Sequence, residues 1–273
     1  MNKSELLELL NRLGLRPSRR LGQNFLLDPN MLDSLVRNAN VQPGESILEI
    51  GPGTGVLTER LLAAGCKLTA VELDHRLAAY LRDERFAGVE GFRLVEADAC
   101  RVDFDELFGD EPFRCIANLP YSSSSQLLAS LSGMRNRPRE IYVLLQKEMA
   151  DRLTAEVGTK DYGVLTVRLG LMYSISILKR IPRDVFFPPP EVVSAYVRMS
   201  LRDAVPDVEL MGRVSRIAGM AFSQRRKKTS RMLEGQYGLD RVLSVFSSLG
   251  LPEDVRADGI TPAQYVGLGR ALI

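Results

Sequence analysis

The chain has 273 residues, with 36 Lys or Arg against 34 Asp or Glu and a formal net charge of +2. A hydrophobic fraction of 45% supports a packed core and excludes a largely disordered chain. The near balance of charge does not by itself indicate nucleic-acid binding, but the charge is unevenly spread: +3 over residues 1–20, −4 over 21–205 and +3 over 206–273.

Cysteine and histidine are too few and too scattered for several classes of site. The cysteines Cys66, Cys100 and Cys115 are odd in number and form no Cys-x-x-Cys pair, and His75 is the one histidine. A disulfide framework, a zinc site and a Ser/His/Asp triad are therefore disfavoured, and a reducing compartment is indicated. No apolar run approaches the roughly 18 residues that span a bilayer. We expect a cytoplasmic monomer with no metal site and no membrane partner.

Predicted strands and helices alternate through the first half of the chain. A short helix near residues 3–13 and a basic stretch at 16–20 precede a helix over 29–39, for which Asp28 is the expected N-cap. The predicted strands that follow lie at 46–50, 67–72, 92–96, 113–117 and 141–145. The helices predicted between and after them lie at 56–64, at 75–82, up to Leu131, and at 146–154. This alternation predicts a parallel, doubly wound α/β sheet, which binds ligands outside the carboxyl ends of its strands.

The pattern changes after residue 160. Val164–Ser176 and Val192–Leu201 predict strands, separated by the segment Phe186-Phe187-Pro188-Pro189-Pro190. From about residue 206 the sequence predicts compact helices. We therefore predict two domains: an α/β domain over 1–205 with a basic N-terminal extension, and a small all-helical C-terminal domain over 206–273.

A glycine-rich turn follows the first strand of the predicted sheet, in Glu49-Ile50-Gly51-Pro52-Gly53-Thr54-Gly55. Its spacing differs from the dinucleotide fingerprint, which needs glycine where Val56 stands, and from a phosphate-binding P-loop. The pattern resembles that of S-adenosylmethionine (SAM) methyltransferases, which implies a Rossmann-like methyltransferase sheet with SAM as cofactor. Glu72 and Asp98, at the ends of the next two strands, are then placed to bind the ribose hydroxyls and the adenine amino group.

Asn118-Leu119-Pro120-Tyr121 follows the fourth predicted strand and resembles the (Asp/Asn)-Pro-Pro-Tyr motif of methyltransferases that modify exocyclic amines. The lone pair of adenine N6 is delocalised into the ring, so this amine is a poor nucleophile. The Asn118 side-chain oxygen and the Leu119 carbonyl can each accept an N6–H bond, which frees the lone pair. Pro120 fixes the backbone, and Tyr121 offers a face for base stacking, worth about 1–3 kcal/mol. Catalysis then depends mostly on positioning.

Further segments, in the same chain order, resemble the ribosomal RNA adenine dimethyltransferase family. They are Leu21-Gly22-Gln23-Asn24-Phe25-Leu26, Gln146-Lys147-Glu148, Tyr162-Gly163, Phe186-x-Pro188-Pro189-Pro190-x-Val192 and Ala221-Phe222-Ser223-Gln224-Arg225-Arg226-Lys227. The resemblance runs from about residue 16 to the C-terminus and is strongest with the bacterial branch that acts on 16S rRNA. It implies dimethylation of N6 on two adjacent adenosines in a hairpin loop near the 3′ end of 16S rRNA. The partner is then the 30S subunit or its precursor.

The resemblance also implies roles for individual positions. The predicted cofactor-binding residues are Asn24, Leu26, Gly51, Gly53, Glu72, Asp98 and Asn118. The predicted catalytic residues are Asn118, Leu119, Pro120, Tyr121 and Phe186, the last of which matches an aromatic residue that stacks on the target base opposite Tyr121. Two departures from the family pattern lie near the target base: Ser122–Ser125 replaces Asn-Ile-Ser, and Val193 replaces a polar residue. They bear on substrate recognition more than on SAM binding.

Two basic stretches are candidate RNA-binding surfaces. Their cations are Arg16, Arg19 and Arg20 before the cofactor motif, and Arg225, Arg226, Lys227 and Lys228 in the C-terminal part. Such cations add salt-dependent affinity for phosphates, although a charge run alone is more typical of a solvated helix face. Beside an adenine-methylating domain we favour RNA binding. An rRNA loop suits such an enzyme because its bases can be splayed out without opening a duplex.

Three alternatives stay open at the level of sequence. A 23S rRNA adenine dimethylase of the macrolide-resistance type shares the main motifs, but the C-terminal module and the Pro-Pro-Pro segment favour the 16S enzyme. A DNA adenine methyltransferase would need a large recognition insertion, for which 273 residues leave little room. A non-catalytic assembly or transcription factor on the same fold is disfavoured by the intact Gly51–Gly55 loop and the Asn118–Tyr121 tetrapeptide.

Overall fold

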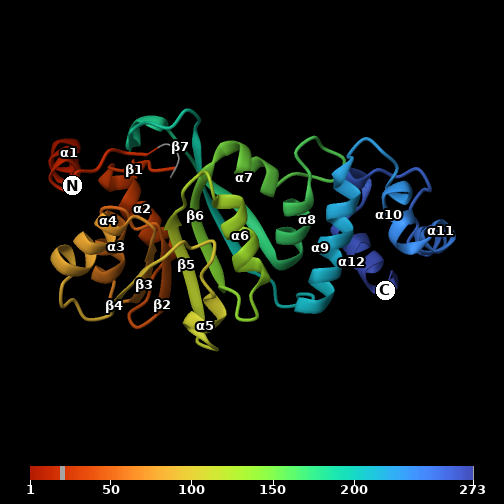
Figure 1. Ribbon diagram of the computed structural model, residues 1–273, viewed down its shortest axis with the longest axis horizontal. Helices are drawn as coiled ribbons and strands as arrows, with labels where there is room; N and C mark the ends of the chain where they lie inside the picture. Colours follow the sequence, from red (N-terminus) through yellow and green to blue (C-terminus); the bar gives the residue numbers. More distant parts are fainter. Residues whose placement is uncertain (19–21, 273) are drawn as a thin grey trace. The chain divides into compact units, whose positions relative to one another are not determined.

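The computed structural model describes residues 1–18 and 22–272 of the chain (Figure 1). It divides into two compact units. The first comprises Met1–Leu131, Asn136–Lys147 and Ser176–Ser200, and the second comprises Ser132–Arg135, Glu148–Ile175 and Leu201–Ile273. The chain therefore passes between the units several times, instead of dividing once after residue 205. The functional division into a methyltransferase domain over 1–205 and an RNA-binding domain over 206–273 stays a prediction.

A seven-stranded sheet forms the framework of the first unit. Its order is β4 (Phe92–Glu96), β3 (Lys67–Glu72), β2 (Ser46–Ile50), β5 (Phe113–Asn118), β6 (Glu140–Gln146), β9 (Ser194–Leu201) and β7 (Tyr173–Ile181). The five strands from β4 to β6 are parallel, as the alternation of strands and helices predicts, and β9 runs antiparallel to β6. The carboxyl ends of four parallel strands, β2 to β5, therefore meet along one edge.

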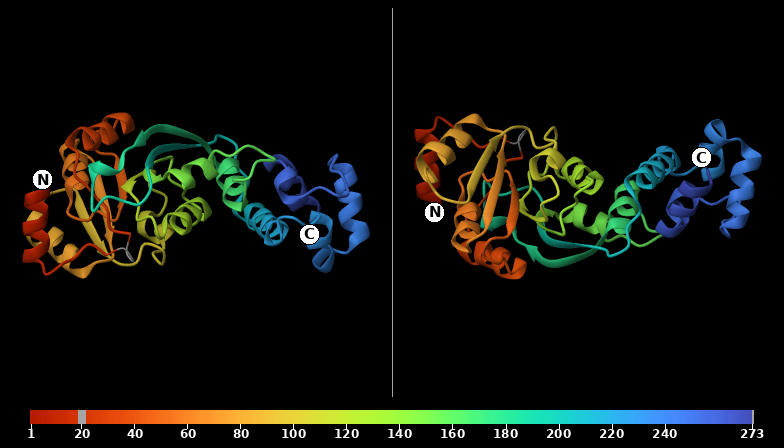
Figure 2. Two further views of the ribbon diagram at one scale, coloured as in Figure 1. Left: turned by 90° about the horizontal axis from the view of Figure 1, so that it is seen from above. Right: turned by 90° about the horizontal axis from the view of Figure 1, so that it is seen from below.

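Helices pack on both sides of this sheet, as the views from above and below show (Figure 2). They are α1 (Lys3–Arg12), α2 (Pro29–Ala39), α3 (Val56–Ala63), α4 (His75–Tyr80), the π-helical turn η1 (Leu81–Arg85), α5 (Phe104–Phe108) and α6 (Ser124–Gly133). The predicted N-cap of α2 is confirmed, since the Asp28 side chain accepts the Met31 N–H at 2.7 Å. α5 was not predicted; it begins with its own aspartate N-cap, Asp103.

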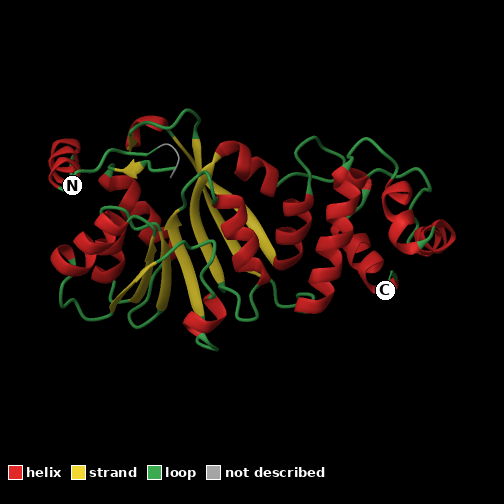
Figure 3. Ribbon diagram, viewed as in Figure 1, coloured by secondary structure: helices red, strands yellow, loops and turns green. Residues whose placement is uncertain are grey.

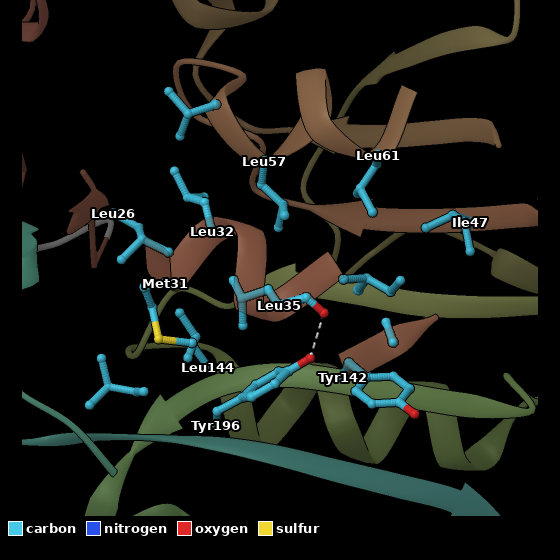
Figure 4. Close-up of a cluster of buried hydrophobic side chains, with 14 of the residues drawn as sticks. Leu26, Met31, Leu32, Leu35, Ile47, Leu57, Leu61, Tyr142, Leu144 and Tyr196 are labelled. Carbon is cyan, nitrogen blue, oxygen red and sulfur yellow. Dashed lines mark hydrogen bonds between the residues drawn. The ribbon is translucent and has the colours of Figure 1, made fainter. Parts of the chain in front are cut away.

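Buried apolar side chains from α2, α3 and the sheet form the main core of the first unit (Figure 4). Leu35 and Leu61 are almost fully buried there, together with Ile47 and Leu144. The buried Tyr196 hydroxyl donates to the Leu35 carbonyl at 2.9 Å, so its polar end is satisfied inside the apolar cluster. This bond ties β9 to α2.

A second, two-stranded sheet brings two distant sequence motifs together. β1 (Phe25–Leu26) pairs antiparallel with β8 (Phe186–Phe187), with Leu26 opposite Phe186. The apolar face of α1 packs nearby, where Leu6 and Leu10 meet Phe25. The Phe25–Leu26 strand is therefore held by contacts from both ends of the first unit's sequence.

The second unit is built mainly from helices (Figure 3). They are α7 (Lys147–Leu153), α8 (Val164–Met172), α9 (Val208–Ser223), α10 (Thr229–Tyr237), α11 (Leu239–Ser248), the 3₁₀ turn η3 (Ala257–Gly259) and α12 (Pro262–Ala271). The short 3₁₀ turn η2 (Arg183–Val185) belongs instead to the first unit, just before β8. The predicted helical character of the C-terminal part is confirmed. Among the residues the structure describes, no helix is both long and apolar enough to cross a bilayer.

The strand predicted at Val164–Ser176 is wrong. Residues Val164–Met172 form α8, and the strand β7 begins only at Tyr173. The apolar, β-branched sequence does not distinguish a strand from a buried helix. The helix is favoured by a capping bond, in which the Thr166 hydroxyl accepts the Gly163 N–H at 3.0 Å, and by burial of Val167 in the helical core of the second unit.

Candidate functional site

A cavity of about 410 Å³ opens at the carboxyl ends of β2, β3, β4 and β5. Its volume lies in the range of roughly 300–1,000 Å³ typical of small-ligand sites. All seven predicted cofactor-binding residues line it: Asn24, Leu26, Gly51, Gly53, Glu72, Asp98 and Asn118. The structure thus brings these residues together, and their role in cofactor binding stays a prediction. Five of them come from the ends of four neighbouring strands or from the loops just after them, which explains why sequence position predicts the site.

The glycine loop has a backbone conformation that favours glycine, and it is closely packed at Gly53. Gly51 and Gly53 have φ angles of +68° and +58°, a region that favours glycine. A Cβ on Gly53 would lie 3.2 Å from the Phe25 ring, and one on Gly51 would lie 3.7 Å from Pro120 Cδ. The loop is therefore packed between the N-terminal motif on one side and the Asn-Leu-Pro-Tyr tetrapeptide on the other.

Glu72 ends β3 and is almost completely buried. One carboxylate oxygen accepts the Gly53 N–H at 3.0 Å, and the other accepts the N–H groups of Leu73 and Asp74, each at 2.9 Å. Burial raises the pKa of this carboxyl, and the three backbone donors oppose that shift. Glu72 therefore organises the loops after two strands as well as presenting a carboxylate to the cavity.

Asp98 lies two residues after β4 and is only partly buried. Its Oδ1 accepts the Cys100 N–H at 2.9 Å, and its other oxygen lies 3.6 Å from the guanidinium of Arg101, a highly exposed side chain. Cys100 is partly exposed and also lines the cavity, whereas Cys66 and Cys115 are buried.

Glu49 also lines the cavity. It stands at the start of the glycine-rich segment, and the sequence predicts no role for it. It is 1% exposed, and its carboxylate accepts the Thr58 hydroxyl at 2.7 Å. Burial raises the pKa of this carboxyl from 4.5 to about 8; the Thr58 bond opposes the shift, and the nearby Glu72 charge adds to it. The signal that could have found it is the acidic residue two positions before the first glycine of the loop.

The Glu49 carboxyl should make stability fall with rising pH. Because its folded pKa is raised, the folded chain keeps a proton between pH 4.5 and 8 that the unfolded chain releases, so the free energy of unfolding decreases across this window. Glu49→Gln removes that loss and can still accept from Thr58. We expect its melting temperature to exceed that of the wild type by a few degrees at pH 8.5, and by less at pH 5.5, since 1 kcal/mol corresponds to roughly 2–4 °C.

The measurement is thermal unfolding of both proteins across this pH range. Glu59→Gln is the control, because Glu59 follows Thr58, the partner of Glu49, on α3 but is exposed and pairs with Arg85 at 3.2 Å. A Glu49→Gln difference that is the same at every pH would contradict the assignment.

Asn118 ends β5 with a defined amide orientation. Its Nδ2 donates to the Asn24 carbonyl at 2.9 Å, which leaves the amide oxygen as the acceptor. Pro120, like Asn118, lines the cavity. Leu119 is buried and does not line the cavity.

The two aromatic residues predicted to hold a target base are placed differently. Tyr121 is partly exposed, and its hydroxyl lies 2.5 Å from the Ser194 hydroxyl. Phe186 is 2% exposed and packs in the apolar core with Leu26 and Met31. In this conformation the Phe186 ring has no accessible face, so its predicted stacking role requires the ring to leave this packing.

The serine run after Tyr121 serves the local backbone. The Ser123 N–H donates to the Pro120 carbonyl at 3.2 Å, and the buried Ser124 hydroxyl donates to the Tyr121 carbonyl at 3.3 Å. These bonds close the turn that leads into α6. The other departure from the family pattern, Val193, is 37% exposed, and its carbonyl accepts the Lys147 N–H at 2.9 Å.

The predicted RNA-binding cations differ in their environments. Arg16 is exposed, whereas Arg19 and Arg20 lie outside the described residues. Arg226, Lys227 and Lys228 are exposed and line a hollow of about 570 Å³ on the second unit, which Arg256 also lines together with Asp254 and Asp258.

Arg225 differs from its neighbours because its guanidinium binds its own chain. It donates to the carbonyls of Lys160 at 2.5 Å and Thr159 at 2.7 Å, and it lies 3.3 Å from Asp258. The prediction that Arg225 is a free phosphate-binding cation is therefore not supported by its contacts. The position of Arg225 in a run of cations does not predict these internal hydrogen bonds.

The cavity carries an excess of negative groups. Glu72, Asp74 and Asp98 line it, against one cation, Arg101, whereas the raised pKa of Glu49, about 8, keeps that carboxyl mostly protonated at neutral pH. Within the described part of the chain, no group of three His, Cys, Asp or Glu side chains is arranged to hold a metal ion. The cavity is therefore suited to a ligand that combines hydroxyl and amino donors with a positive charge.

Comparison with known proteins relates this site to a family. The model of the ribosomal RNA adenine dimethylase family matches residues 15–272. A ribosomal RNA small subunit methyltransferase A from Methylococcus capsulatus is 39% identical, over 94% of this chain and 98% of its own length. A protein of the same name from Bordetella bronchiseptica is 41% identical, over 93% and 94% of the two chains.

Solved structures agree on the fold. A dimethyladenosine transferase from Plasmodium falciparum superposes with a TM-score of 0.75 at 24% identity, covering 89% of this chain and 95% of that one. The 23S rRNA methyltransferase ErmE superposes with a TM-score of 0.66 at 25% identity, covering 91% and 99%. With the family match spanning almost the whole sequence, the chain belongs to the ribosomal RNA adenine dimethylases.

Proposed function

We propose that this enzyme dimethylates N6 of two adjacent adenosines in a hairpin loop near the 3′ end of 16S rRNA. Its substrate is then the small ribosomal subunit or its precursor in the cytoplasm, and the enzyme acts as a monomer. The observation that carries this proposal is the Asn118 amide at the wall of the cavity, whose nitrogen is engaged and whose oxygen is free to accept. The names of the relatives at 39% and 41% identity support the small subunit as target.

The cavity residues fit SAM as the methyl donor. Glu72 is placed to accept the ribose hydroxyls, Asp98 to accept the adenine amino group, and the Gly51–Gly53 backbone to leave room for the methionine part. When bound, SAM supplies an electrophilic methyl group on a positively charged sulfur. The acidic lining favours that cation, and Asn24 and Leu26 complete the wall on the side of the N-terminal motif.

The tetrapeptide activates the target amine. The Asn118 amide oxygen and the Leu119 carbonyl accept the two N6–H bonds, so the nitrogen moves toward tetrahedral geometry and its lone pair becomes available. Tyr121 supports one face of the base by stacking. The protein's main contribution is to hold the nitrogen close to the methyl group and in line with it.

The direct test is transfer of labelled methyl groups from SAM to unmethylated 30S particles, naked 16S rRNA, 50S particles and duplex DNA. We expect label in 30S particles, recovered as N6-dimethyladenosine in the 3′-terminal hairpin. Label in 50S particles or DNA, with none in 30S particles, would overturn the proposal. Label in 50S particles alone would favour the alternative of a 23S rRNA methyltransferase, the activity named for ErmE.

The exposed cations Arg226, Lys227 and Lys228 are proposed to bind rRNA phosphates from the second unit. Changing all three to glutamate should weaken binding to 30S particles and reduce the slope of log affinity against log salt by about 2–3, since each phosphate contact contributes roughly 0.7–0.9. Binding assays over a series of KCl concentrations measure this slope. SAM affinity, measured by calorimetry, should stay unchanged because the hollow lies outside the cofactor cavity.

Arg225 is kept in this variant because its contacts are internal to the protein. The control reverses Lys67 and Arg93, which are exposed cations on β3 and β4 and do not line the cofactor cavity. A salt slope that is unchanged in the triple variant, or reduced equally in the control, would count against the proposed phosphate contacts.

A further inference from the structure

Ser194 is a fully buried hydroxyl at the rim of the catalytic tetrapeptide. It is the first residue of β9, has no exposed surface, and places its Oγ 2.5 Å from the Tyr121 hydroxyl. The two residues are 73 positions apart in the sequence. Buried hydroxyls are almost always hydrogen-bonded, so the fully buried Ser194 hydroxyl is satisfied by this bond to the partly exposed Tyr121.

The position of Ser194 is set by the sheet. Asn118 on β5 is opposite Leu144 on β6, which is opposite Tyr196 on β9. Ser194 is opposite Gln146, two residues closer to the carboxyl edge of β6, on the same face of β9 as Tyr196. Ser194 therefore lies about 7 Å along the strand direction from the aligned residues Asn118, Leu144 and Tyr196. At this height in the sheet, the chain has left β5 and entered the tetrapeptide.

The Tyr121 backbone is fixed independently. Its carbonyl accepts the Ser124 hydroxyl at 3.3 Å, and Gly22 approaches its amide so closely that a Cβ there would lie 3.0 Å from the nitrogen. With the backbone held, two side-chain torsions decide where the ring lies. The bond from the ring's far end to Ser194 fixes the first torsion, because it anchors the hydroxyl oxygen and with it the long axis of the ring. Rotation about the second torsion leaves that oxygen in place, so the bond sets where the ring lies.

We propose that Ser194 is a positioning residue that holds the Tyr121 ring at the place where the target adenine stacks. The inference rests on the proposed function, since it takes Tyr121 to be the stacking surface. Ser194 itself does not line the cofactor cavity. Loss of its hydroxyl therefore affects the handling of RNA and leaves the binding of SAM unchanged.

The test is a double-mutant cycle on unmethylated 30S particles with Ser194→Ala, Tyr121→Phe and the double variant. Tyr121→Phe keeps the aromatic face and removes only the hydroxyl that Ser194 holds. We expect each single variant to lower kcat/KM for 30S particles about tenfold, within the range of stacking contributions. The double variant should be no worse than either single one, because both remove the same interaction. Ser194→Cys, which keeps a weak donor, should recover part of the loss.

Two further measurements separate positioning from general damage. The dissociation constant for SAM should change less than about twofold in all variants, since a tenfold change corresponds to 1.4 kcal/mol and no cavity contact is lost. The ratio of N6-monomethyl to N6-dimethyladenosine in the product should rise, because a loosely held base leaves before its second methylation. Ser200→Ala is the matched control on the same strand, where the hydroxyl donates to Glu140 at 3.4 Å.

The outcomes are distinct. If the wild type transfers no methyl group to RNA, the proposed function is wrong and this inference is wrong with it. If the wild type is active but Ser194→Ala matches it, or the two single losses add in the double variant, the inference alone is wrong. If Ser194→Ala loses SAM affinity and kcat/KM equally, the Ser194–Tyr121 bond serves the stability of the fold. Tyr121→Phe then still decides the role of the ring hydroxyl, and unchanged turnover in that variant overturns the inference.

Discussion

Methyl transfer should be almost abolished by Asn118→Ala. This substitution removes the acceptor oxygen for the target amine and the donor that binds the Asn24 carbonyl at 2.9 Å. We expect kcat to fall by at least about 100–1,000-fold, the loss typical for a positioned hydrogen-bonding group at a reacting centre. Affinity for 30S particles should change little, because the proposed phosphate contacts lie on the second unit. Single-turnover transfer and a separate particle-binding assay measure the two quantities.

Asn118→Asp sharpens the test. The carboxylate keeps acceptor oxygens, but it loses the donor that faces the Asn24 carbonyl, so its orientation is no longer fixed. Its turnover should lie between those of alanine and the wild type. The control is Asn38→Ala on α2, an exposed asparagine whose amide donates to Ser34 at 3.1 Å. Near-normal turnover in Asn118→Ala would refute the proposed activation of the amine.

Glu72→Gln should mainly weaken the binding of SAM. The carboxylate accepts from Gly53 on one oxygen and from Leu73 and Asp74 on the other. A glutamine has one acceptor atom, so its NH2 group must face a backbone N–H, and one donor loses its partner. Each buried unsatisfied donor costs roughly 1–3 kcal/mol. That cost lowers stability, whereas SAM binding weakens because the ribose hydroxyls lose a charged acceptor, worth roughly 1.5–3 kcal/mol. We therefore expect the dissociation constant for SAM, measured by calorimetry, to rise by about 10–100-fold.

Glu96→Gln is the matched control for this substitution. Glu96 is the cross-strand partner of Glu72 in the β3–β4 pair, but it is exposed and does not line the cavity. Its amide variant should bind SAM as the wild type does. If Glu72→Gln also retains full affinity, the carboxylate does not organise the cavity in the way its hydrogen bonds indicate.

The predictions from sequence held where local signals decide the structure. The strands Ser46–Ile50, Lys67–Glu72 and Phe92–Glu96 form with the predicted bounds. A glycine or an acidic residue stands at the end of each of these strands or just after it. The cavity residues at the strand ends could therefore be predicted from separate local motifs. The parallel order then brings them together without any further information from sequence.

Features that depend on distant partners were not predictable from local signals. α8 is helical because Val167 packs against helices that begin more than 40 residues later in the chain, and no local signal reveals that packing. Arg225 looks like its cationic neighbours, yet carbonyls more than 60 residues away occupy its guanidinium. Phe186 is buried by its pairing with Leu26, which the motif pattern does not contain.

Cys100 gives the cavity a chemical reporter of its own occupancy. Its two fellow cysteines are buried, and burial raises the pKa of Cys66 to about 12 and that of Cys115 further still. The Cys100 pKa is also raised, by burial and by Asp98, so alkylation should be slow but selective and should speed up with pH. A maleimide reagent should therefore add one label, detectable by mass. SAM bound in the cavity should slow that reaction in proportion to its occupancy, which measures cofactor affinity without RNA, turnover or radioactive label.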